Sequence, residues 1–216
     1  MADFLRGERG GGYYRRLLTE AGNPCGGPQD IVAGAVLRYL MRKTTPGDVL
    51  DLGAGFGRHA FLFAISGVPV HCVDLDPERV EKLNAIAARE RLPLRAEVRD
   101  IEEGISGSYA VIVCSFVHHY LSAGRGIDLI REMQAHTLTG GLNAVAAVTR
   151  DGDFFQETEH CDAPKGLCYF SRGELRTYYR DWEILDSSEY AGAMAQRKSN
   201  GEHYVNVSAY VLAQKP

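Results

Sequence analysis

The amino-acid sequence predicts an α/β fold: a doubly wound, mostly parallel sheet of seven strands that ends in an antiparallel C-terminal hairpin. Between residues 30 and 150, short apolar runs of strand length alternate with longer runs of helical period. The last two strand-like runs, EILDSSEY and HYVNVSAYVLAQK, follow one another with no intervening helix. Such a pair indicates an antiparallel hairpin at the sheet edge.

The 216 residues are enough for one sizeable core, so we expect a single domain over residues 30–216. Residues 1–29 are predicted to form an irregular N-terminal arm, because GERGGGYY and GNPCGGPQD are dense in helix breakers. Two interpretations of Tyr13 and Tyr14 stay open: they close over a ligand as a lid, or they pack on the sheet.

The remaining elements are predicted in chain order. Asp30 caps a helix over residues 31–41, which TTPGD ends. Strands are expected in DVLDLG, VPVHCVDLD, PLRAEVRD, YAVIVCSFV and LNAVAAVT, with helices in RHAFLFAISG, PERVEKLNAIAARERL and RGIDLIREMQAHTL. Asp76 and Pro77 suit the start of the second of these helices. Ser171 caps a short helix in SRGELRTYYRDW before the hairpin.

Composition narrows the function classes. The formal charge of −4 gives no bulk attraction to nucleic acid or to an anionic membrane. No apolar run approaches the ~20 residues of a membrane span, and the N-terminus lacks the apolar stretch of a secretory signal. Five scattered cysteines are a poor disulfide framework and fit a reducing cytoplasm. We therefore expect a cytoplasmic protein with a small-molecule partner, as a monomer or a homodimer.

The segment VLDLGAGFGRH carries the strongest functional signal. Gly53, Gly55 and Gly57 follow the first strand at alternate positions, where ligands bind in a sheet of this kind. Glycine there lets a ligand approach the backbone without meeting a Cβ atom. Asp74 closes the next strand about twenty residues further on, as expected of a carboxylate that binds ribose hydroxyls. The alternative role of Asp74 is that of a cap or turn residue.

The spacing of the loop argues against phosphate. Arg58 stands where a dinucleotide-binding loop would have its third glycine, and the Gly-Lys-Ser/Thr ending of a phosphate loop is absent. Asp51, just before the loop, would repel a phosphate and suits a cationic ligand. These features favour S-adenosyl-L-methionine, a nucleoside that carries a sulfonium and an ammonium and has no phosphate.

The run VLDLGAGFGRHAFLFAISGVPVHCVDLDPERV resembles the first two strands of a class I S-adenosylmethionine-dependent methyltransferase, a Rossmann-like fold. The resemblance covers about residues 30–150. It implies S-adenosyl-L-methionine as cofactor and S-adenosyl-L-homocysteine as product. It also implies cofactor-binding positions at the ends of the first four strands: Gly53, Ala54 and Gly55 for the methionine part, Asp74 for the ribose, Leu75, Asp100 and Ile101 for the adenine, and Ser115 and Phe116 beside the methionine and the substrate.

The C-terminal segments YFSRGELRTYYRDWEILDSSE and NGEHYVNVSAYVLAQKP resemble the end of the tellurite-resistance methyltransferases. That resemblance implies a small cytoplasmic enzyme that methylates chalcogen oxyanions and other soft nucleophiles. YYRRLL lies where the family has an aromatic arm over the cofactor, which implicates Tyr14. The family has a His-Arg pair before its final strand and an Arg near the start of that strand. The nearest residues here are Gln196, Arg197 and His203.

Candidate catalytic residues divide by acceptor type. A soft anion needs no general base, whereas an alcohol, an amine or a neutral thiol needs one, and His118 and His119 are the candidates. Their alternative is one imidazole packed inside and one facing solvent. An anionic acceptor would instead need a positive pocket, for which the candidates are Arg150, His160, Arg172, Arg197 and His203. Solvated surface charge is the alternative for each of these.

Cys161 and Cys168, with His160 beside them and Cys25 from the arm, have the chemistry of a soft metal or metalloid site. Their spacing is not that of a zinc ribbon and cysteine is often a small buried side chain, so no metal site is predicted. The leading hypothesis is methyl transfer to a small, soft or anionic acceptor, either a chalcogen or metalloid oxyanion or a thiol. The alternatives are an O- or N-acceptor with a histidine base, and a non-catalytic protein that binds the nucleoside or a metalloid.

Overall fold

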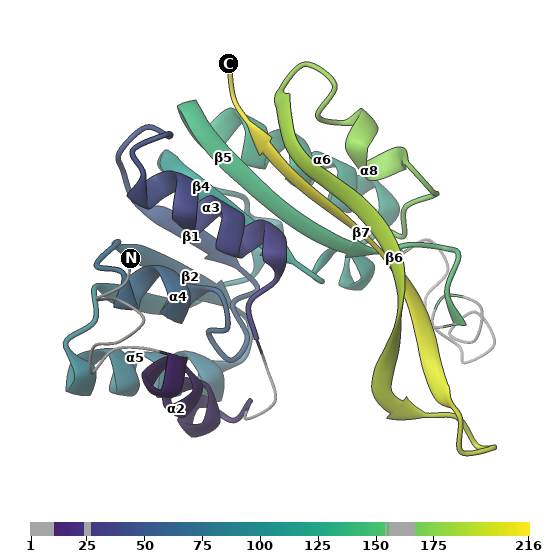
Figure 1. Ribbon diagram of the computed structural model, residues 1–216, viewed down its shortest axis with the longest axis horizontal. Coiled ribbons are helices and arrows are strands. Elements are labelled where there is room, and N and C mark those ends of the chain that lie inside the picture. Colours follow the sequence, from purple (N-terminus) through teal and green to yellow (C-terminus); the bar gives the residue numbers. More distant parts are fainter. Residues whose placement is uncertain (1–10, 24–26, 154, 156–166) are drawn as a thin grey trace.

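A computed structural model describes residues 11–23, 27–153, 155 and 167–216 of the chain. Its centre is a seven-stranded sheet in the order β3-β2-β1-β4-β5-β7-β6 (Figure 1). The first five strands are parallel, and β7 runs antiparallel to both of its neighbours. The predicted fold class is therefore confirmed. The strands are β1 (Val49–Leu52), β2 (Val70–Asp74), β3 (Leu94–Val98), β4 (Tyr109–Ser115), β5 (Thr137–Val148), β6 (Glu183–Arg197) and β7 (His203–Gln214).

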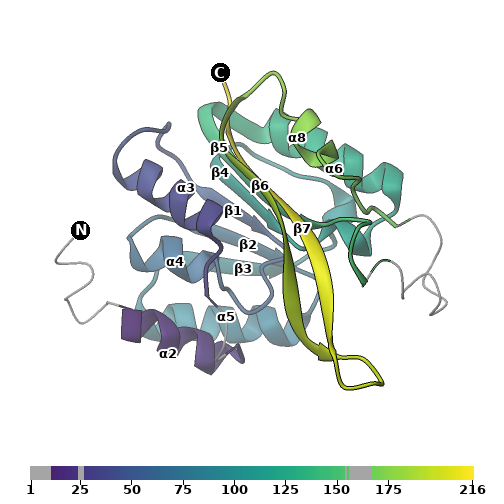
Figure 2. The same ribbon diagram turned by 45° about the vertical axis from the view of Figure 1, so that its right-hand side comes forward.

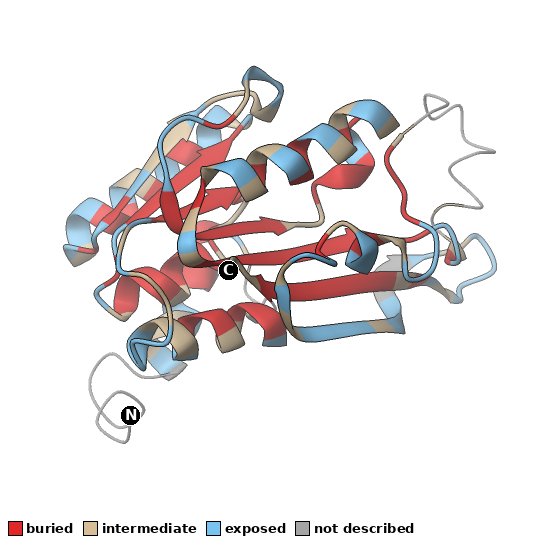
Figure 3. Ribbon diagram, turned by 90° about the horizontal axis from the view of Figure 1, so that it is seen from above, coloured by how far each residue is buried: buried red, intermediate tan, exposed pale blue. Residues whose placement is uncertain are grey.

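Helices cover both faces of the sheet (Figure 2). One face carries α3, α4 and α5, with α2 packed on α4 and α5, and the other carries α6 and α8. The central strands are buried, and the outer faces of the helices are exposed (Figure 3). The described helices are α2 (Gly11–Ala21), α3 (Asp30–Leu40), α4 (Ala60–Ile65), α5 (Pro77–Glu90), α6 (Ala123–His136), α8 (Glu174–Thr177), and the 3₁₀ turns η1 (Ile101–Glu103) and η2 (His118–Tyr120).

The start of α5 confirms the predicted cap. The Asp76 carboxylate accepts the backbone N–H groups of Glu78 and Arg79 at 3.0 and 3.3 Å, and Pro77 occupies the first turn. These bonds satisfy amides that have no partner inside the helix, a contribution of about 1 kcal/mol. The helix therefore begins directly after the loop that follows β2, which fixes where the end of β2 lies.

The N-terminal arm is helical over part of its length, so the prediction of an irregular arm is wrong for Gly11–Ala21. Leu17 and Leu18 are fully buried, and the Tyr13 hydroxyl donates to the Glu90 carboxylate at 2.9 Å. Burial of this apolar pair against α4 and α5 outweighs the local preference of the glycines. The division into arm and domain stays a prediction.

Two predicted caps are also wrong. Asp30 is the first residue of α3, whose N-cap is Gln29 without a side-chain hydrogen bond. The N-cap of α8 is Gly173, and the Ser171 N–H instead donates to the Glu174 carboxylate at 2.7 Å. In both helices the chain enters from an irregular segment whose path the sequence pattern does not determine.

The C-terminal hairpin is longer than predicted. β6 and β7 continue through most of the segment expected as their connection, and they leave only residues 198–202 between them. β7 lies between β5 and β6, so β6 forms the sheet edge. The far end of the hairpin projects beyond the rest of the sheet (Figure 1).

Among the described helices, none has the length and apolar character needed to cross a bilayer. The three cysteines in the described part of the chain, Cys72, Cys114 and Cys168, are buried free thiols.

Candidate active site

The three loop glycines all have the left-handed backbone, with φ of +66°, +54° and +74° at Gly53, Gly55 and Gly57. A Cβ atom at Gly53 would lie 2.5 Å from Val117 Cγ2, and one at Gly57 would lie 2.5 Å from Leu83 Cδ2. A Cβ atom at Gly55 would meet only the Arg79 guanidinium at 4.0 Å. Packing therefore requires glycine at the outer two positions, whereas Gly55 borders open space that a ligand can enter.

Asp74 holds the glycine loop. Its Oδ2 atom accepts the Gly55 N–H at 2.6 Å, and its Oδ1 atom accepts the Asp76 N–H at 3.0 Å. The turn role considered for this residue is thus present in the structure. A carboxylate has about four lone-pair positions, so two stay available for a pair of ribose hydroxyls. Binding the ribose would not require Asp74 to release the loop.

Asp51 lies in β1 beneath the loop and is only 2% exposed. Burial raises the pKa of its carboxyl group to about 7, although the Arg58 charge and the Ala60 N–H favour the ionised form. Its Oδ2 atom is buried and meets no hydrogen-bond partner among the described residues. A bound cation would favour the carboxylate here, which fits the ammonium or sulfonium of S-adenosylmethionine.

The end of β4 adjoins the loop, because Gly53 packs against Val117. The Ser115 Oγ atom is buried without a hydrogen-bond partner in the described part of the chain. Phe116 has φ of +57°, an uncommon conformation for a residue other than glycine, and its N–H donates to the Ala146 carbonyl at 2.7 Å. Backbone strain of this kind gathers at ligand sites.

The expected adenine-binding residues lie beyond the carboxyl ends of β2 and β3, at the same edge of the sheet. Leu75 is 67% exposed. The Asp100 carboxylate accepts the Glu102 N–H at 2.9 Å, and the Ile101 carbonyl accepts from the Arg125 guanidinium. The apolar side chain of Leu75 is thus available to a ring at this edge, while Ala54 is buried in the loop.

Tyr14 brings the N-terminal arm to the same edge. Its hydroxyl donates to the Arg58 carbonyl at 2.6 Å, and burial raises the pKa of the phenol. Tyr13 points elsewhere, toward Glu90. The structure therefore places Tyr14, and not Tyr13, beside the glycine loop. A closing motion of this arm stays a prediction.

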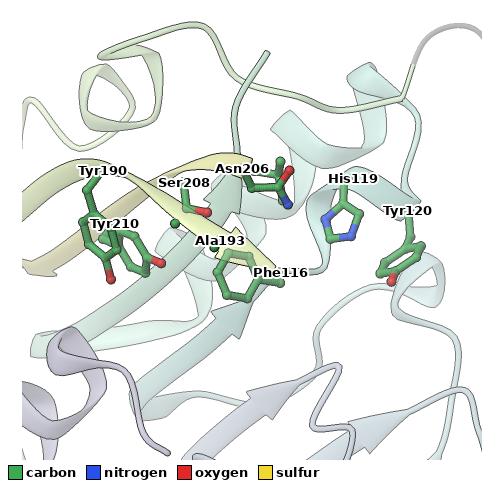
Figure 4. A pocket seen from close by; sticks show the side chains of 10 residues that line it. Phe116, His119, Tyr120, Tyr190, Ala193, Asn206, Ser208 and Tyr210 are labelled. Atoms are coloured by element: carbon green, nitrogen blue, oxygen red, sulfur yellow. The ribbon is translucent and has the colours of Figure 1, made fainter. Parts of the chain in front are cut away.

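A cavity of about 460 Å³ opens next to the end of β4, between the sheet edge and the hairpin (Figure 4). We call it the aromatic cavity. Tyr190 and Tyr210 stack in it with ring centres 4.7 Å apart and planes 8° apart, and Phe116 meets Tyr210 edge-on. Its lining is Phe116, His119, Tyr120, Val148, Tyr190, Gly192, Ala193, Asn206, Ser208 and Tyr210.

The two candidate histidines differ in position. His119 lines the aromatic cavity, whereas His118 is fully buried and packs against Phe170, with its Nδ1 atom 3.9 Å from Cys114 Sγ. Burial lowers the pKa of each imidazole to about 4, so both are neutral at pH 7. Only His119 is placed to meet an acceptor.

The predicted positive pocket is not assembled from the residues that the structure describes. Arg197 and His203 pair at the far end of the hairpin, where Arg197 donates to the Gly201 carbonyl at 2.7 Å. Arg150 donates to the Tyr169 carbonyl at 3.0 Å, and the Arg172 side chain is 87% exposed. None of these four lines the aromatic cavity. His160 lies outside the described residues, as do the side-chain details of Gln196.

Cys168 has the surroundings of a packed core residue. Its Sγ atom would be 2.3 Å from a Cβ atom at Gly126, and burial raises the pKa of its thiol to about 11. Cys25 and Cys161, the other members of the considered thiol site, lie outside the described residues. Within the described ranges, no group of three or more potential ligands is placed to hold a metal ion.

Sequence reasoning missed the hairpin side of the cavity. Asn206, Ser208 and Tyr210 occupy alternate positions of β7, so their side chains share one face of the sheet. Polar and aromatic residues at this spacing in NVSAY were a usable signal. The signal needed the neighbouring strands to be known before it pointed to a ligand site.

Comparison with known proteins places this site in a family. Residues 34–208 match the family described as "Tellurite resistance protein TehB". This chain belongs to that family. A crystal structure of TehB from Haemophilus influenzae is 30% identical, superposes with a TM-score of 0.71, and covers 85% of this chain and 62% of that one. The resemblance to class I S-adenosylmethionine-dependent methyltransferases of the tellurite-resistance type is therefore confirmed.

Two curated relatives extend the comparison. "Hemagglutinin 1" of Eikenella corrodens is 34% identical over 183 residues, which are 84% of this chain and 59% of that protein. The "Probable S-adenosyl-L-methionine-dependent methyltransferase TehB" of Haemophilus influenzae (strain 10810) is 31% identical over 172 residues, 79% of this chain and 58% of that one. The chain thus spans less than two thirds of the length of each of these relatives.

More distant structures share the fold alone. Magnesium protoporphyrin IX methyltransferase from Synechocystis PCC 6803 with bound SAH is 15% identical, has a TM-score of 0.63, and covers 99% of this chain and 97% of that one.

Proposed function

We propose that this protein transfers the methyl group of S-adenosyl-L-methionine to a small acceptor bound in the aromatic cavity. The observation that carries the proposal is the continuity of the two sites. Phe116, expected beside the methionine part of the cofactor, also lines the cavity. A cofactor seated on the glycine loop would therefore lie next to an acceptor.

The residues at the loop fit the cofactor. Gly55 leaves space for it, Asp74 has lone pairs for the ribose, and the buried carboxylate of Asp51 suits its positive charge. When bound, the cofactor supplies a methyl group already activated by a sulfonium. The protein then contributes orientation and exclusion of water, which account for much of the acceleration in such a displacement. Ser115 and Phe116 would position the acceptor side.

For the acceptor we propose a soft nucleophile, a thiol or a chalcogen or metalloid species, in keeping with the family. A second candidate, an O- or N-acceptor that loses a proton, is favoured by one observation. His119 lines the cavity, and its lowered pKa leaves the imidazole neutral and able to accept that proton. The free thiols of the described cysteines support a reducing compartment such as the cytoplasm, and we propose that location.

Calorimetric titration with S-adenosylmethionine and S-adenosylhomocysteine tests the cofactor. We expect saturable binding that weakens at least tenfold in Asp74→Ala and is unchanged in Asp181→Ala, whose carboxylate is on the surface. Absence of binding by either ligand to the wild-type chain would refute the proposal. Normal affinity without turnover across selenite, tellurite, arsenite, thiols and phenols would favour a non-catalytic nucleoside-binding protein.

The pH profile of turnover separates the two acceptor types. If His119 accepts a proton from the acceptor, its own protonation should lower the rate only as the pH approaches about 4. The variant His119→Gln should then lose most of its activity toward protonated acceptors. An acceptor that is already an anion should be methylated at a similar rate by both enzymes.

A further inference from the structure

The aromatic cavity carries no formal charge among its described lining residues. Eight of the residues are tyrosine, phenylalanine, asparagine, serine or small aliphatic residues, and glycine and His119 complete the set. His119 is neutral at pH 7 because burial lowers the pKa of its imidazole to about 4. An anion that leaves water for such surroundings loses hydration without gaining a paired cation from the protein.

The nearby arginines are directed elsewhere. Arg150 donates to the Tyr169 carbonyl and Arg197 to the Gly201 carbonyl at the end of the hairpin. Arg172 lies 3.8 Å from the Glu189 carboxylate. The Arg58 charge reaches Tyr210, yet Arg58 does not line the cavity, and it also acts on the carboxyl group of Asp51. The cations of this region are thus engaged outside the cavity.

Aromatic rings occupy both ends of the cavity (Figure 4). The stacked pair Tyr190 and Tyr210 lies at one end, His119 and Tyr120 lie at the other with ring centres 4.2 Å apart, and Phe116 lies between them. The Tyr120 ring is 75% exposed, so its surface is available to a ligand. Rings arranged in this way favour a flat apolar group through stacked or edge-on contacts.

Asn206 adds the polar element. Its side chain is in the lining and the residue is only 8% exposed, while its Oδ1 atom is buried and accepts no hydrogen bond from any described residue. Buried amides rarely stay unsatisfied in native proteins. Because an amide can turn about its last bond, Asn206 can offer a ligand either its oxygen or its N–H groups.

We propose that the aromatic cavity selects an uncharged acceptor with a flat apolar ring, and that Asn206 recognises the polar group of that acceptor. The inference rests on the proposed methyl transfer and narrows its acceptor class. Within the soft nucleophiles it favours a neutral ring-bearing thiol over a chalcogen or metalloid oxyanion. The hairpin supplies both determinants, the Tyr190–Tyr210 pair and Asn206.

Calorimetry on the full chain saturated with S-adenosylhomocysteine tests the selection directly. The probes are phenylmethanethiol, mercaptoacetate and selenite, which are respectively a neutral ring thiol, a charged thiol and an oxyanion. We expect phenylmethanethiol to bind at least tenfold more tightly than mercaptoacetate, and selenite to give no saturable heat. Equal or tighter binding of mercaptoacetate or selenite would overturn the inference.

Two variants test the determinants. Asn206→Leu keeps a similar volume without the amide, so it should weaken phenylmethanethiol at least fivefold and leave toluene, which has no polar group, unchanged. Tyr190→Ala, at a half-exposed position of the edge strand, should weaken phenylmethanethiol and toluene alike, whereas Tyr190→Phe should not. If both Asn206→Leu and Tyr190→Ala bind phenylmethanethiol as the wild type does, the assignment of the cavity is wrong.

The same titrations separate this inference from the proposed function. If S-adenosylhomocysteine fails to bind, the proposed function fails, and phenylmethanethiol titrated into the chain alone still tests the cavity. If S-adenosylhomocysteine binds but selenite is the ligand that competes for the cavity, only the present inference fails.

Discussion

Replacing the loop glycines by alanine distinguishes a position kept free for a ligand from one fixed by packing. Gly55 and Gly57 both have positive φ, and an L-residue in that conformation costs about 1–2 kcal/mol. At Gly57 the new Cβ would also lie 2.5 Å from Leu83 and 2.9 Å from Phe61, and such overpacking adds about 1–3 kcal/mol. At Gly55 it would meet only the Arg79 side chain, at ordinary contact distance.

We therefore expect Gly55→Ala to lower the free energy of unfolding by about 1–2 kcal/mol, and Gly57→Ala by about 2–5 kcal/mol. In a chain of this length each kcal/mol corresponds to roughly 2–4 °C in Tm. The order reverses for S-adenosylmethionine. Gly55→Ala places a methyl group in the ligand's space and should weaken binding by about ten- to a hundredfold, since tenfold is about 1.4 kcal/mol. Folded Gly57→Ala should bind nearly as the wild type does.

Gly67 provides the matched control. It has φ of +79°, a Cβ atom added there would meet no atom within 4 Å, and it lies in the turn after α4, behind the sheet edge that carries the loop. Gly67→Ala should match Gly55→Ala in stability and match the wild type in cofactor affinity. Urea unfolding and calorimetry measure the two quantities separately. Unchanged S-adenosylmethionine affinity in Gly55→Ala would refute the placement of the cofactor on this loop.

Three further predictions concern buried ionisable groups. Because the pKa of Asp51 is raised to about 7, S-adenosylmethionine should bind with proton release near neutral pH and weaken by up to tenfold per pH unit below 7, and Asp51→Asn should remove that dependence in calorimetry. The folded-state pKa of His118, about 4, lies below the unfolded value of 6.5, so the unfolded chain binds more protons between these values. Stability should fall by about 3 kcal/mol as pH drops from 6.5 to 4, a contribution absent from the urea unfolding of His118→Gln. Tyr14→Phe should cost about 1 kcal/mol of stability through its lost bond to Arg58, and thermal unfolding measures it.

The parallel part of the sheet and the cofactor loop were predictable because their signals are local. β1, β2 and β4 are buried almost throughout, and such strands read as continuous apolar runs in the sequence. Gly53, Gly55 and Asp74 stand at fixed distances from the ends of two of these strands. A ligand site made at strand ends needs no knowledge of distant contacts, so the sequence was sufficient for it.

The remainder depended on contacts far apart in the chain. Helix α2 forms in a glycine-rich segment because Leu17 and Leu18 are buried against α4 and α5. The lining of the cavity depends on strand register, since Ser208 pairs with Val148 on one side and with Tyr190 on the other. A shift of one residue would turn Asn206, Ser208 and Tyr210 away from the cavity. Sequence spacing alone does not determine that register.

The two halves of the site therefore carry different kinds of information about function. The cofactor half is a local motif that many methyltransferase structures share at low identity, so family membership accounts for it. The acceptor half is built by the hairpin, and the family match ends at residue 208, before Tyr210 completes the stacked pair. Where the family has a His-Arg pair, this chain has Gln196 and Arg197, and Arg197 is engaged at the turn. The acceptor of this protein is consequently better inferred from the side chains of β6 and β7 that face the cavity than from the name of its family.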